Sequence, residues 1–456
     1  MDAIIPLTKN IVKLRYEALP QTTQEITKNF ILDTVGVAIA GSSVPICRIV
    51  VNQVKEWGGK GEATIFAYGG RVPIMNAVLT NATMAHALEF DDTHDAAGLH
   101  ACASVVPAAL AAAEAREGIT GKDLLLAVAL GVDLVCRLGL SIKTPISWVR
   151  SATCGGFGAA AAAGKILGLD EEKMLNAMGI VYTQTSGNEQ GTLDGAMTKP
   201  LQLGFAAKAG VVSAILSHHG VVGPKNVLEG RYGYFKLYER GEYDPSQLVA
   251  GLGKDFKGIH LSVKPYPSCR LTHPAIDAAQ KIFQQFRPDP EQIEEITIIL
   301  NQQCFDIVGH PFKIRKNPYV DAQFSVAYTV AVALKKGDFD LEDIQEERIR
   351  DLSVLELVRK VRVVVDERLE NQRGVAPVTV RVRTKDGKEY SERIEIPKGH
   401  TNNPLDFDAI AQKYRKCVGH SSPIISAEKV EKAIDMICNL ERIDRIKELI
   451  NNLAAV

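Results

Sequence analysis

Near residue 262 the spacing of apolar residues changes from a helical pattern to a strand pattern. This change constrains the fold of the chain more than any other feature of its sequence. Up to about residue 260, apolar residues recur at helical spacing in segment after segment, with short polar stretches between them. The segment TTQEITKNFILDTVGVAIAG, for example, predicts a helix with a threonine cap at its start and an end at Gly41. Many segments are rich in Ala and Gly, as in GKDLLLAVALGVDLVCRLG, so we expect closely packed helices that are buried on most sides.

Strand patterns begin beyond residue 262. EEITIIL and VRKVRVVVDE each predict a strand, and VAPVTVRVRTKDGKEYSERIEI predicts a hairpin that turns at Asp386-Gly387. Helices are expected between the strands, in HPAIDAAQKIFQQF and DAQFSVAYTVAVALKKGDF, and again after GHTNNPLD. The sequence therefore predicts a mainly α protein. Both chain ends, residues 1–262 and 402–456, would build a large all-helical domain, and residues 263–401 would form an inserted α+β domain.

Composition favours a globular protein that acts on a small molecule. The chain has 456 residues, which is long for a single core, with 46% hydrophobic and 23% charged residues. Its formal net charge of -1 gives no basic footprint for nucleic acid. The eight cysteines are scattered without a CxxC pair, so we expect reduced thiols and no zinc knuckle or disulfide framework. A cleft between two domains is a usual place for a small-molecule site.

A cytoplasmic location without a membrane span is expected. The N-terminal MDAIIPLTKNIVKLRYE lacks the basic and long apolar regions of a secretory signal. The longest run of apolar and small residues, VVPAALAAAEA, is interrupted by Pro107 and ends in charged residues, which argues against a membrane span.

The stretch ALEFDDTHDAAGLH, together with the helical run before it, concentrates acids and imidazoles ahead of a soft apolar segment. It contains four acids and follows or includes three histidines: Glu89, Asp91, Asp92, Asp95, His86, His94 and His100. His100 directly precedes ACASVVPAALAAAEA, so it is expected at the N-terminus of a helix, where a substrate carboxylate would be favoured. An imidazole there can move protons near pH 7. Two alternatives stay open: the acids simply cap the helix, or the mixture binds a divalent ion.

Two further segments carry basic side chains that could bind an anionic substrate. Lys199 precedes Pro200 at the start of an apolar helix, where its charge opposes the helix dipole. It could bind an anionic substrate, supply a low-pKa amine, or be an ordinary exposed lysine. Where the strand patterns begin, the segment LSVKPYPSCRLTHPAIDAA brings together side chains that suit a di- or tricarboxylate: Lys264, Tyr266, Arg270 and His273. The alternative is that this segment is an ordinary linker.

The run GGFGAAAAAG at residues 155–164 resembles a dinucleotide fingerprint. That motif needs a preceding hydrophobic strand and an acid about 20 residues later. The preceding segment here is SWVRSATC, and KILGLDEEKM follows as more helix. We therefore interpret the run as close helix packing through small residues and expect no nucleotide.

Taken together, these segments resemble the MmgE/PrpD family, which includes 2-methylcitrate dehydratase, cis-aconitate decarboxylase and iminodisuccinate epimerase. The resemblance rests on the order and spacing of HALEFDDT, GFGAAAAAGKILGLD, TKPLQLGFAAKAG, KPYPSCRLTHPAIDAA and FSVAYTVAVAL, and it spans nearly the whole chain. It implies a helical domain with an inserted lid domain, a homodimer, a site in the cleft between domains, and neither a metal nor an organic cofactor.

The resemblance also implies roles for individual residues. Catalytic roles fall to His100, Lys199, Tyr266 and Asp92, and His94 is a rival for the place of His100. Substrate contacts are expected from Glu89, Asp91, Thr93 and Lys264 by this resemblance, and from Arg150, Arg270 and His273 by the chemistry of their side chains. Two histidines carried by many members are replaced here, by Val149 before the Gly-rich run and by Cys269 after the K-x-Y-P motif. Arg150 could compensate as a carboxylate clamp.

The implied chemistry is proton transfer at a carbon next to a carboxylate. Such a carbon is a weak acid, so cations must stabilise the enolate-like intermediate, and Lys199, Lys264 and Arg270 are the candidates. His100 would be the base, and Tyr266 or a carboxyl of residues 89–92 would protonate a leaving hydroxyl. The sequence thus predicts a cofactor-independent dehydratase of a 2-methylcitrate-like hydroxy acid. Its alternatives are an epimerase of a substituted succinate, a cis-aconitate-type decarboxylase, which the lost histidines disfavour, and a non-catalytic binding member.

Overall fold

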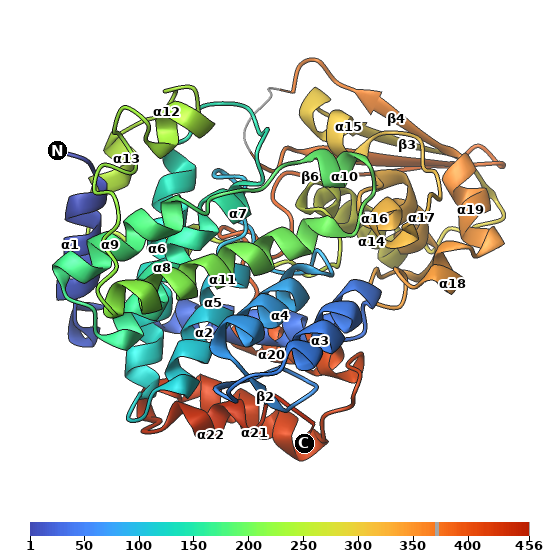
Figure 1. Cartoon of the computed structure of the whole chain (residues 1–456). Helices are drawn as coiled ribbons and strands as arrows, with labels where there is room; N and C mark the ends of the chain where they lie inside the picture. Colours follow the sequence, from blue (N-terminus) through green and yellow to red (C-terminus); the bar gives the residue numbers. More distant parts are fainter. Residues whose placement is uncertain (370–373, 456) are drawn as a thin grey trace. The chain divides into compact units, whose positions relative to one another are not determined.

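Helices make up most of the structure, a computed structural model that describes residues 1–369 and 374–455 (Figure 1). The fold is therefore mainly α, as the sequence predicts. The chain divides into two units. The first comprises Met1–Gly191, Met197–Leu261 and Asp406–Val456, and the second comprises Thr192–Ala196 and Ser262–Leu405. That the second unit acts as a lid stays a prediction.

The first unit is built from helices contributed by both ends of the chain. They are α1 (Ile4–Lys13), α2 (Gln21–Gly41), α3 (Pro45–Trp57), α4 (Ile74–His86), α5 (Cys102–Ala115), α6 (Gly121–Ser141), α7 (Arg150–Thr153), α8 (Gly155–Leu167), α9 (Glu171–Tyr182), α11 (Thr198–His218), α12 (Tyr234–Tyr238), α13 (Ser246–Val249), α20 (Phe407–Gly419), α21 (Ala427–Cys438) and α22 (Ile446–Ile450). The short α10 (Gln190–Leu193) lies at the point where the small segment of the second unit begins.

Small residues let the central helices of this unit approach one another closely. The helix α8 contacts both α6 and α11 (Figure 1). A methyl group added at Gly158 of α8 would lie 2.3 Å from Val135 and 2.8 Å from the carbonyl oxygen of Gly131 on α6. On the other side, one added at Gly210 of α11 would lie 2.6 Å from the carbonyl oxygen of Gly156. The GGFG run is therefore a helix-packing feature, and a helical turn, not a strand, precedes it.

Two details of the helical prediction are wrong. The helix α2 does end at Gly41, but it begins at Gln21 after Pro20, and no threonine side chain caps it. Pro20 takes the N-cap position, where its missing N–H costs no helical hydrogen bond. The first unit is also not all-helical. A small antiparallel ribbon pairs β1 (Ala63–Thr64) with β2 (Arg71–Val72).

Two helices of this unit are long and apolar enough to cross a membrane by length and composition alone. They are α6 and α11. In α6, 94% of the most apolar window is buried inside the protein, so packing against neighbouring helices accounts for its composition. In α11 the corresponding share is 50%. The expectation that the protein has no membrane partner stays a prediction.

A four-stranded sheet organises the second unit. Its strands are β3 (Ile293–Leu300), β4 (Val361–Val365), β5 (Val378–Thr384) and β6 (Glu389–Ile394), in the order β4-β3-β5-β6. β5 and β6 form the predicted antiparallel hairpin, β3 also pairs antiparallel with β5, and β4 runs parallel to β3. The three strand predictions are thus confirmed.

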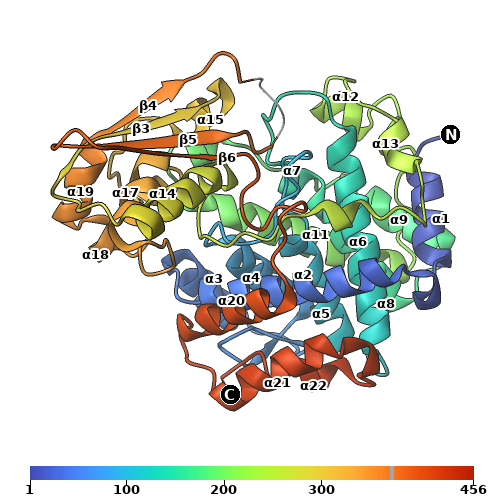
Figure 2. The same cartoon turned by 180° about the vertical axis from the view of Figure 1, so that it is seen from behind.

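Helices of the second unit cover one face of this sheet. They include α14 (His273–Phe286), which contacts β5 and β6, and α17 (Val326–Lys336), which contacts β4 (Figure 2). Alternate residues of the strands, such as Ile296 and Ile298 of β3, are buried accordingly. The remaining helices are α15 (Gln302–Val308), α16 (Pro318–Gln323), α18 (Glu346–Ile349) and α19 (Leu352–Arg359).

The segment DAQFSVAYTVAVALKKGDF does not form one helix. α16 ends at Gln323 and α17 begins at Val326, where the side chain of Ser325 accepts a hydrogen bond from the backbone N–H of Tyr328. A serine N-cap inside an apolar run starts a new helix, because its hydroxyl replaces a missing backbone partner. Helical periodicity alone did not reveal this break.

Candidate active site

The candidate site lies in the connection between α4 and α5 in the first unit. His86 is the last residue of α4, and α5 begins at Cys102. Between them the chain carries the acids and His100, and three of the acids are buried: Glu89, Asp91 and Asp92 are each at most 5% exposed. A short connection between two buried helices therefore places several titratable side chains in a dry environment, where charges interact strongly.

The N-terminus of α5 is occupied by Asp92. Its carboxylate accepts hydrogen bonds from the backbone N–H groups of Ala101 (2.8 Å) and Cys102 (3.0 Å). A substrate carboxylate was expected at this helix end, but Asp92 already accepts from these two backbone N–H groups, which disfavours that expectation. The alternative in which an acid caps the helix holds for Asp92.

Burial and the neighbouring Asp91 raise the pKa of Asp92 to about 7, although the two amides work against the shift. The folded protein therefore binds this proton more tightly than the unfolded chain, in which aspartate has a pKa of about 3.9. The resulting stability is complete at low pH and is lost as the pH rises toward the raised pKa.

We therefore expect the free energy of unfolding of the wild type to fall with pH relative to that of Asp92→Asn. Between about pH 5 and pH 7 the difference should approach about 1.4 kcal/mol per pH unit, the slope for one proton. Urea unfolding of both proteins across this range measures it. Parallel stability curves would show that Asp92 keeps an ordinary pKa.

The tautomer of His100 follows from its surroundings. Its Nδ1 lies 2.5 Å from the backbone carbonyl oxygen of Asp92, which can only accept a hydrogen bond. Nδ1 therefore carries the hydrogen, and in the neutral ring the lone pair resides on Nε2. Thr93 Oγ1 lies 3.3 Å from the same Nδ1, and the backbone N–H of His100 donates to Ser151 Oγ. These contacts fix the ring in the orientation that a general base requires.

His86 is the site residue that sequence reasoning left without a role. Its Nδ1 lies 2.8 Å from Asp91 Oδ2, and the same carboxylate oxygen lies 3.5 Å from His100 Nδ1. The two imidazole rings are 4.7 Å apart between centroids. Asp91 thus links two histidines and can stabilise positive charge on either ring. The signal was present in the sequence, because His86 precedes Glu89 by three residues at the end of a helix.

Lys199 joins this group from the first turn of α11. Its ammonium donates to Glu89 Oε1 and lies 3.2 Å from His86 Nε2. Burial lowers the pKa of Lys199, but Glu89 and Glu189 raise it more, so the pKa lies above its ordinary value. Lys199 is therefore a cation at neutral pH. The alternative of a low-pKa amine acting as a base is wrong for this residue.

Glu89 has an unusual backbone conformation. Its φ of 51° lies in the left-handed region, which side chains other than glycine seldom adopt. Such a conformation persists only where surrounding contacts enforce it, and it is typical of functional sites. Here it directs the carboxylate to Lys199, whose cation needs a partner at a helix N-terminus.

Three side chains of the site could also hold a divalent ion. One donor atom from each of His86, Asp91 and His100 lies within 4.8 Å of the others. The hydrogen bonds described above already account for these close distances, and the Lys199 ammonium beside His86 would repel a cation. The absence of a metal nevertheless stays a prediction.

Two other predicted candidates have structural contacts in the first unit. Arg150 is buried and donates to the backbone carbonyl oxygens of Ala97 (3.1 Å) and Thr144 (2.5 Å), so it fastens the loop that precedes His100. These contacts favour a structural role over a carboxylate clamp. His94 Nδ1 accepts from the backbone N–H of Ala97, and burial lowers the pKa of His94 to about 4. His100 is therefore the better candidate base.

The remaining predicted residues, Lys264, Tyr266, Arg270 and His273, belong to the second unit and are buried. The hydroxyl of Tyr266 lies 2.6 Å from Asp277 Oδ1, and burial together with this carboxylate raises its pKa well above that of free tyrosine. A proton held so tightly favours a structural role for Tyr266 over that of a catalytic acid. Arg270 donates to the carbonyl oxygen of Lys398 and to His273 Nδ1, and Lys264 is fully buried. Their contact with substrate stays a prediction.

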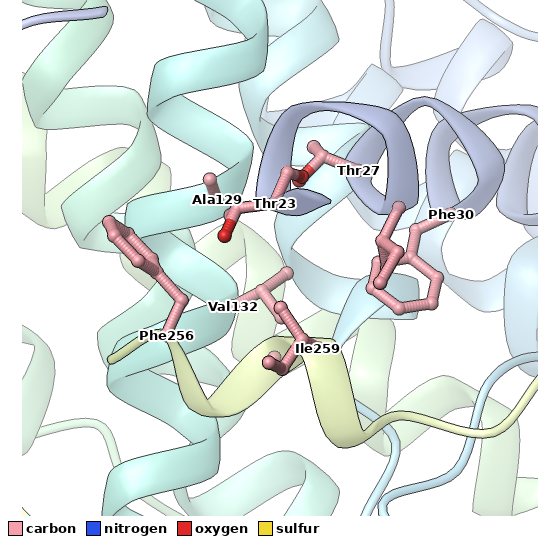
Figure 3. A pocket seen from close by; sticks show the side chains of 9 residues that line it. Thr23, Thr27, Phe30, Ala129, Val132, Phe256 and Ile259 are labelled. Carbon is pink, nitrogen blue, oxygen red and sulfur yellow. The ribbon is translucent and has the colours of Figure 1, made fainter. Parts of the chain in front are cut away.

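A cavity elsewhere in the first unit does not contribute to the site. Figure 3 shows it between Thr23, Phe30, Val132, Phe256 and Ile259. Its volume of about 10 Å³ has room for roughly one water molecule. It is mostly apolar and includes none of the acids or histidines described above, so it is no candidate for substrate binding.

Comparison with known proteins gives matches along most of the chain. The family model of the MmgE/PrpD N-terminal domain matches residues 6–246, and that of the MmgE/PrpD C-terminal domain matches residues 266–442. The cis-aconitate decarboxylase of Aspergillus terreus is 29% identical, over 96% of this chain and 93% of its own length. The human cis-aconitate decarboxylase is 27% identical over 92% and 87%. The 2-methylcitrate dehydratase of Cupriavidus necator is 22% identical over 90% and 88%.

Proposed function

The chain belongs to the MmgE/PrpD family, and from that premise we propose that it is a lyase that moves a proton at a carbon next to a carboxylate. Its substrate is a di- or tricarboxylate. The observation that carries the proposal is the fixed tautomer of His100, which puts a basic Nε2 on the most exposed ring of the cluster. The His100 side chain is 15% exposed, whereas that of His86 is fully buried.

The base works through its buried partners. When His100 Nε2 accepts a proton from the substrate carbon, the ring becomes a cation. Asp91, 3.5 Å from Nδ1, stabilises that cation. His86 in turn holds Asp91 by a 2.8 Å hydrogen bond. The arrangement resembles the base-and-acid pairing of other enzymes that orient an imidazole with a carboxylate, and it supplies part of the electrostatic stabilisation that proton removal needs.

Lys199 supplies positive charge for the substrate carboxylate. Removing a proton next to a carboxylate places a second negative charge on the substrate, and a cation in a dry site stabilises that charge most. Lys199 is the ammonium held at the cluster by Glu89, and its raised pKa keeps it charged. Substrate would share this cation with Glu89.

Dehydration is the first candidate reaction. The C–H bond breaks with its proton going to His100, the electron pair forms a C=C bond, and the hydroxyl on the neighbouring carbon leaves as water. This reaction needs an acid for the leaving hydroxyl. Asp92 has a raised pKa, but both its oxygens accept from helix amides, so another acid has to serve or the proton must return from His100.

Decarboxylation of a cis-aconitate-like acid is the second candidate, and two observations favour it. The relatives of highest identity described above are named cis-aconitate decarboxylases. The reaction also needs a single proton donor: the bond to a carboxyl group breaks, carbon dioxide leaves, and protonated His100 returns a proton to the carbon. A cluster with one partly exposed imidazole suits that requirement. Against it stand Val149 and Cys269, which replace family histidines.

Proton NMR of the reaction products separates these possibilities. The purified protein is incubated with cis-aconitate, 2-methylcitrate and a substituted succinate in separate samples. New allylic or vinyl proton signals without gas release identify a dehydratase, because a fully substituted double bond carries no vinyl proton. New alkene signals with release of carbon dioxide identify a decarboxylase. A stereoisomer without either would identify the epimerase alternative. No change in any acid would contradict the proposal. A homodimer, a cytoplasmic location and cofactor independence accompany this proposal as predictions.

A further inference from the structure

Another buried ion pair of the first unit, besides Lys199 and Glu89, contacts residues 89–92 through Phe90. Lys413 of α20 and Asp33 of α2 are joined by a 2.6 Å contact between Nζ and Oδ1. Both residues are buried, with exposed side-chain fractions of 7% and 1%. They come from opposite ends of the sequence, so the pair connects the C-terminal part of the chain to the N-terminal helices.

Lys413 also forms a hydrogen bond with the backbone of the candidate site. Its Nζ donates to the carbonyl oxygen of Phe90 at 2.7 Å and lies 3.8 Å from the centre of the Phe90 ring. Phe90 stands between Glu89, with its left-handed backbone, and Asp91, the carboxylate shared by two histidines. A single ammonium thus binds a carboxylate, a carbonyl and an aromatic face at this point.

The helices that carry the pair are held firmly against each other. One turn from Asp33, a methyl group added at Gly36 of α2 would lie 2.8 Å from the ring of Tyr414, the residue after Lys413. Such a close approach leaves little room for the two helices to slide. The Lys413 ammonium is therefore a fixed point relative to α2, and the Phe90 carbonyl is tied to it.

A buried ion pair is a poor means of gaining stability. Taking two charges out of water costs about as much as their attraction returns, and a matched apolar pair is often as stable. A fixed local arrangement is a better reason to keep it. The strained backbone of Glu89 needs such external support, because an isolated residue would relax out of the left-handed region.

We propose that Asp33 and Lys413 are positioning residues that hold residues 89–92 in the geometry required for proton transfer by His100. The inference rests on the function proposed above. Lys413 acts through the Phe90 carbonyl and does not itself touch the substrate. Asp33 keeps the ammonium in place, and its charge adds to the effect of burial and of Asp91 in raising the pKa of Asp92.

The test compares Lys413→Met with a matched control, Lys28→Met. Lys28 is also buried and also joins α2 to the C-terminal part, through Glu441 (2.8 Å) and the carbonyl oxygen of Cys438 (3.1 Å). None of its contacts described above involves residues 89–92. Both variants should lower the free energy of unfolding. Only Lys413→Met should lower kcat, by about 100-fold, because a displacement of about 1 Å in a site costs that much, with KM changed less than about threefold.

A second readout does not depend on turnover. Amide hydrogen exchange of the segment 87–95, followed by mass spectrometry, should become at least about tenfold faster in Lys413→Met and stay unchanged in Lys28→Met. If the wild type converts none of the acids tried, the proposed function fails, and the exchange result still decides the positioning role. Should Lys413→Met not fold, Asp33→Asn takes its place and should accelerate exchange in the same segment.

The double variant Asp33→Asn/Lys413→Met separates charge balance from positioning. The double variant removes both charges of the ion pair. If Lys413→Met lost activity only because the charge of Asp33 was no longer balanced, the double variant would recover activity. Positioning predicts that kcat stays low, because the Phe90 carbonyl still lacks its donor. The proposal is overturned if Lys413→Met loses stability to the same degree as Lys28→Met while its kcat and its exchange in 87–95 match the wild type.

Discussion

Replacing His100 by asparagine is expected to lower kcat by about a thousandfold, within the range known for loss of a general base. Asparagine can still donate an N–H to the Asp92 carbonyl, which His100 Nδ1 contacts at 2.5 Å. It has no basic nitrogen to replace Nε2. The variant should therefore fold and bind substrate with KM little changed. Steady-state kinetics on the substrate found by product NMR measure the loss.

His94→Asn is the matched control for this variant. His94 lies in the same connection, six residues earlier, and Nδ1 accepts from the backbone N–H of Ala97. The amide oxygen of asparagine can accept the same hydrogen bond. Its kcat should stay within a few-fold of the wild type. If His100→Asn keeps its turnover, or His94→Asn loses as much, the assignment of the base is wrong.

Replacing Lys199 by methionine is expected to lower kcat/KM by about a thousandfold or more. The ammonium is the positive group that offsets charge on the substrate, and its removal leaves Glu89 buried beside an anionic ligand. Methionine keeps the length of the side chain, so packing changes little. The loss should appear in both kcat and KM, since binding and chemistry each depend on the cation.

Two further variants show which role of Lys199 matters. Lys208→Met changes a partly exposed lysine on the same helix, and its kcat/KM should remain close to that of the wild type. Glu89→Gln in the Lys199→Met background removes the buried negative charge that Lys199 no longer balances. It should restore stability but not activity if Lys199 acts on the substrate. Recovery of activity in the double variant would mean that Lys199 serves only to neutralise Glu89.

Much of the fold could be predicted because it depends on local patterns. The hairpin of β5 and β6 follows from alternating side chains on both sides of Asp386-Gly387. The long helices follow from apolar spacing and from small residues, such as Gly158, that let them approach closely. Helix starts were harder to place. A serine cap at Ser325 divides one apolar run into two helices, and neither part of the run looks different in sequence.

The site was predictable where its residues lie close in sequence. The acids and His100 belong to one connection, and Lys199 was singled out because its charge opposes the dipole of its own helix. Their partners were not predictable. Asp33 and Lys413 are 380 positions apart, and nothing in the local sequence distinguishes a buried lysine of an amphipathic helix from an exposed one. His86 was named with the other histidines of the segment but given no role, because its contact with Lys199, 113 positions away, cannot be read from the sequence.

Solvent deuterium incorporation tests the central claim most directly. The wild type and His100→Asn are incubated in deuterated water with cis-aconitate, 2-methylcitrate or a substituted succinate, and proton NMR follows each carbon next to a carboxylate. We expect the wild type to incorporate deuterium at such a carbon in one of these acids, and His100→Asn to do so about a thousandfold more slowly. Equal incorporation by both proteins, or none by the wild type in any acid, would contradict proton transfer by His100.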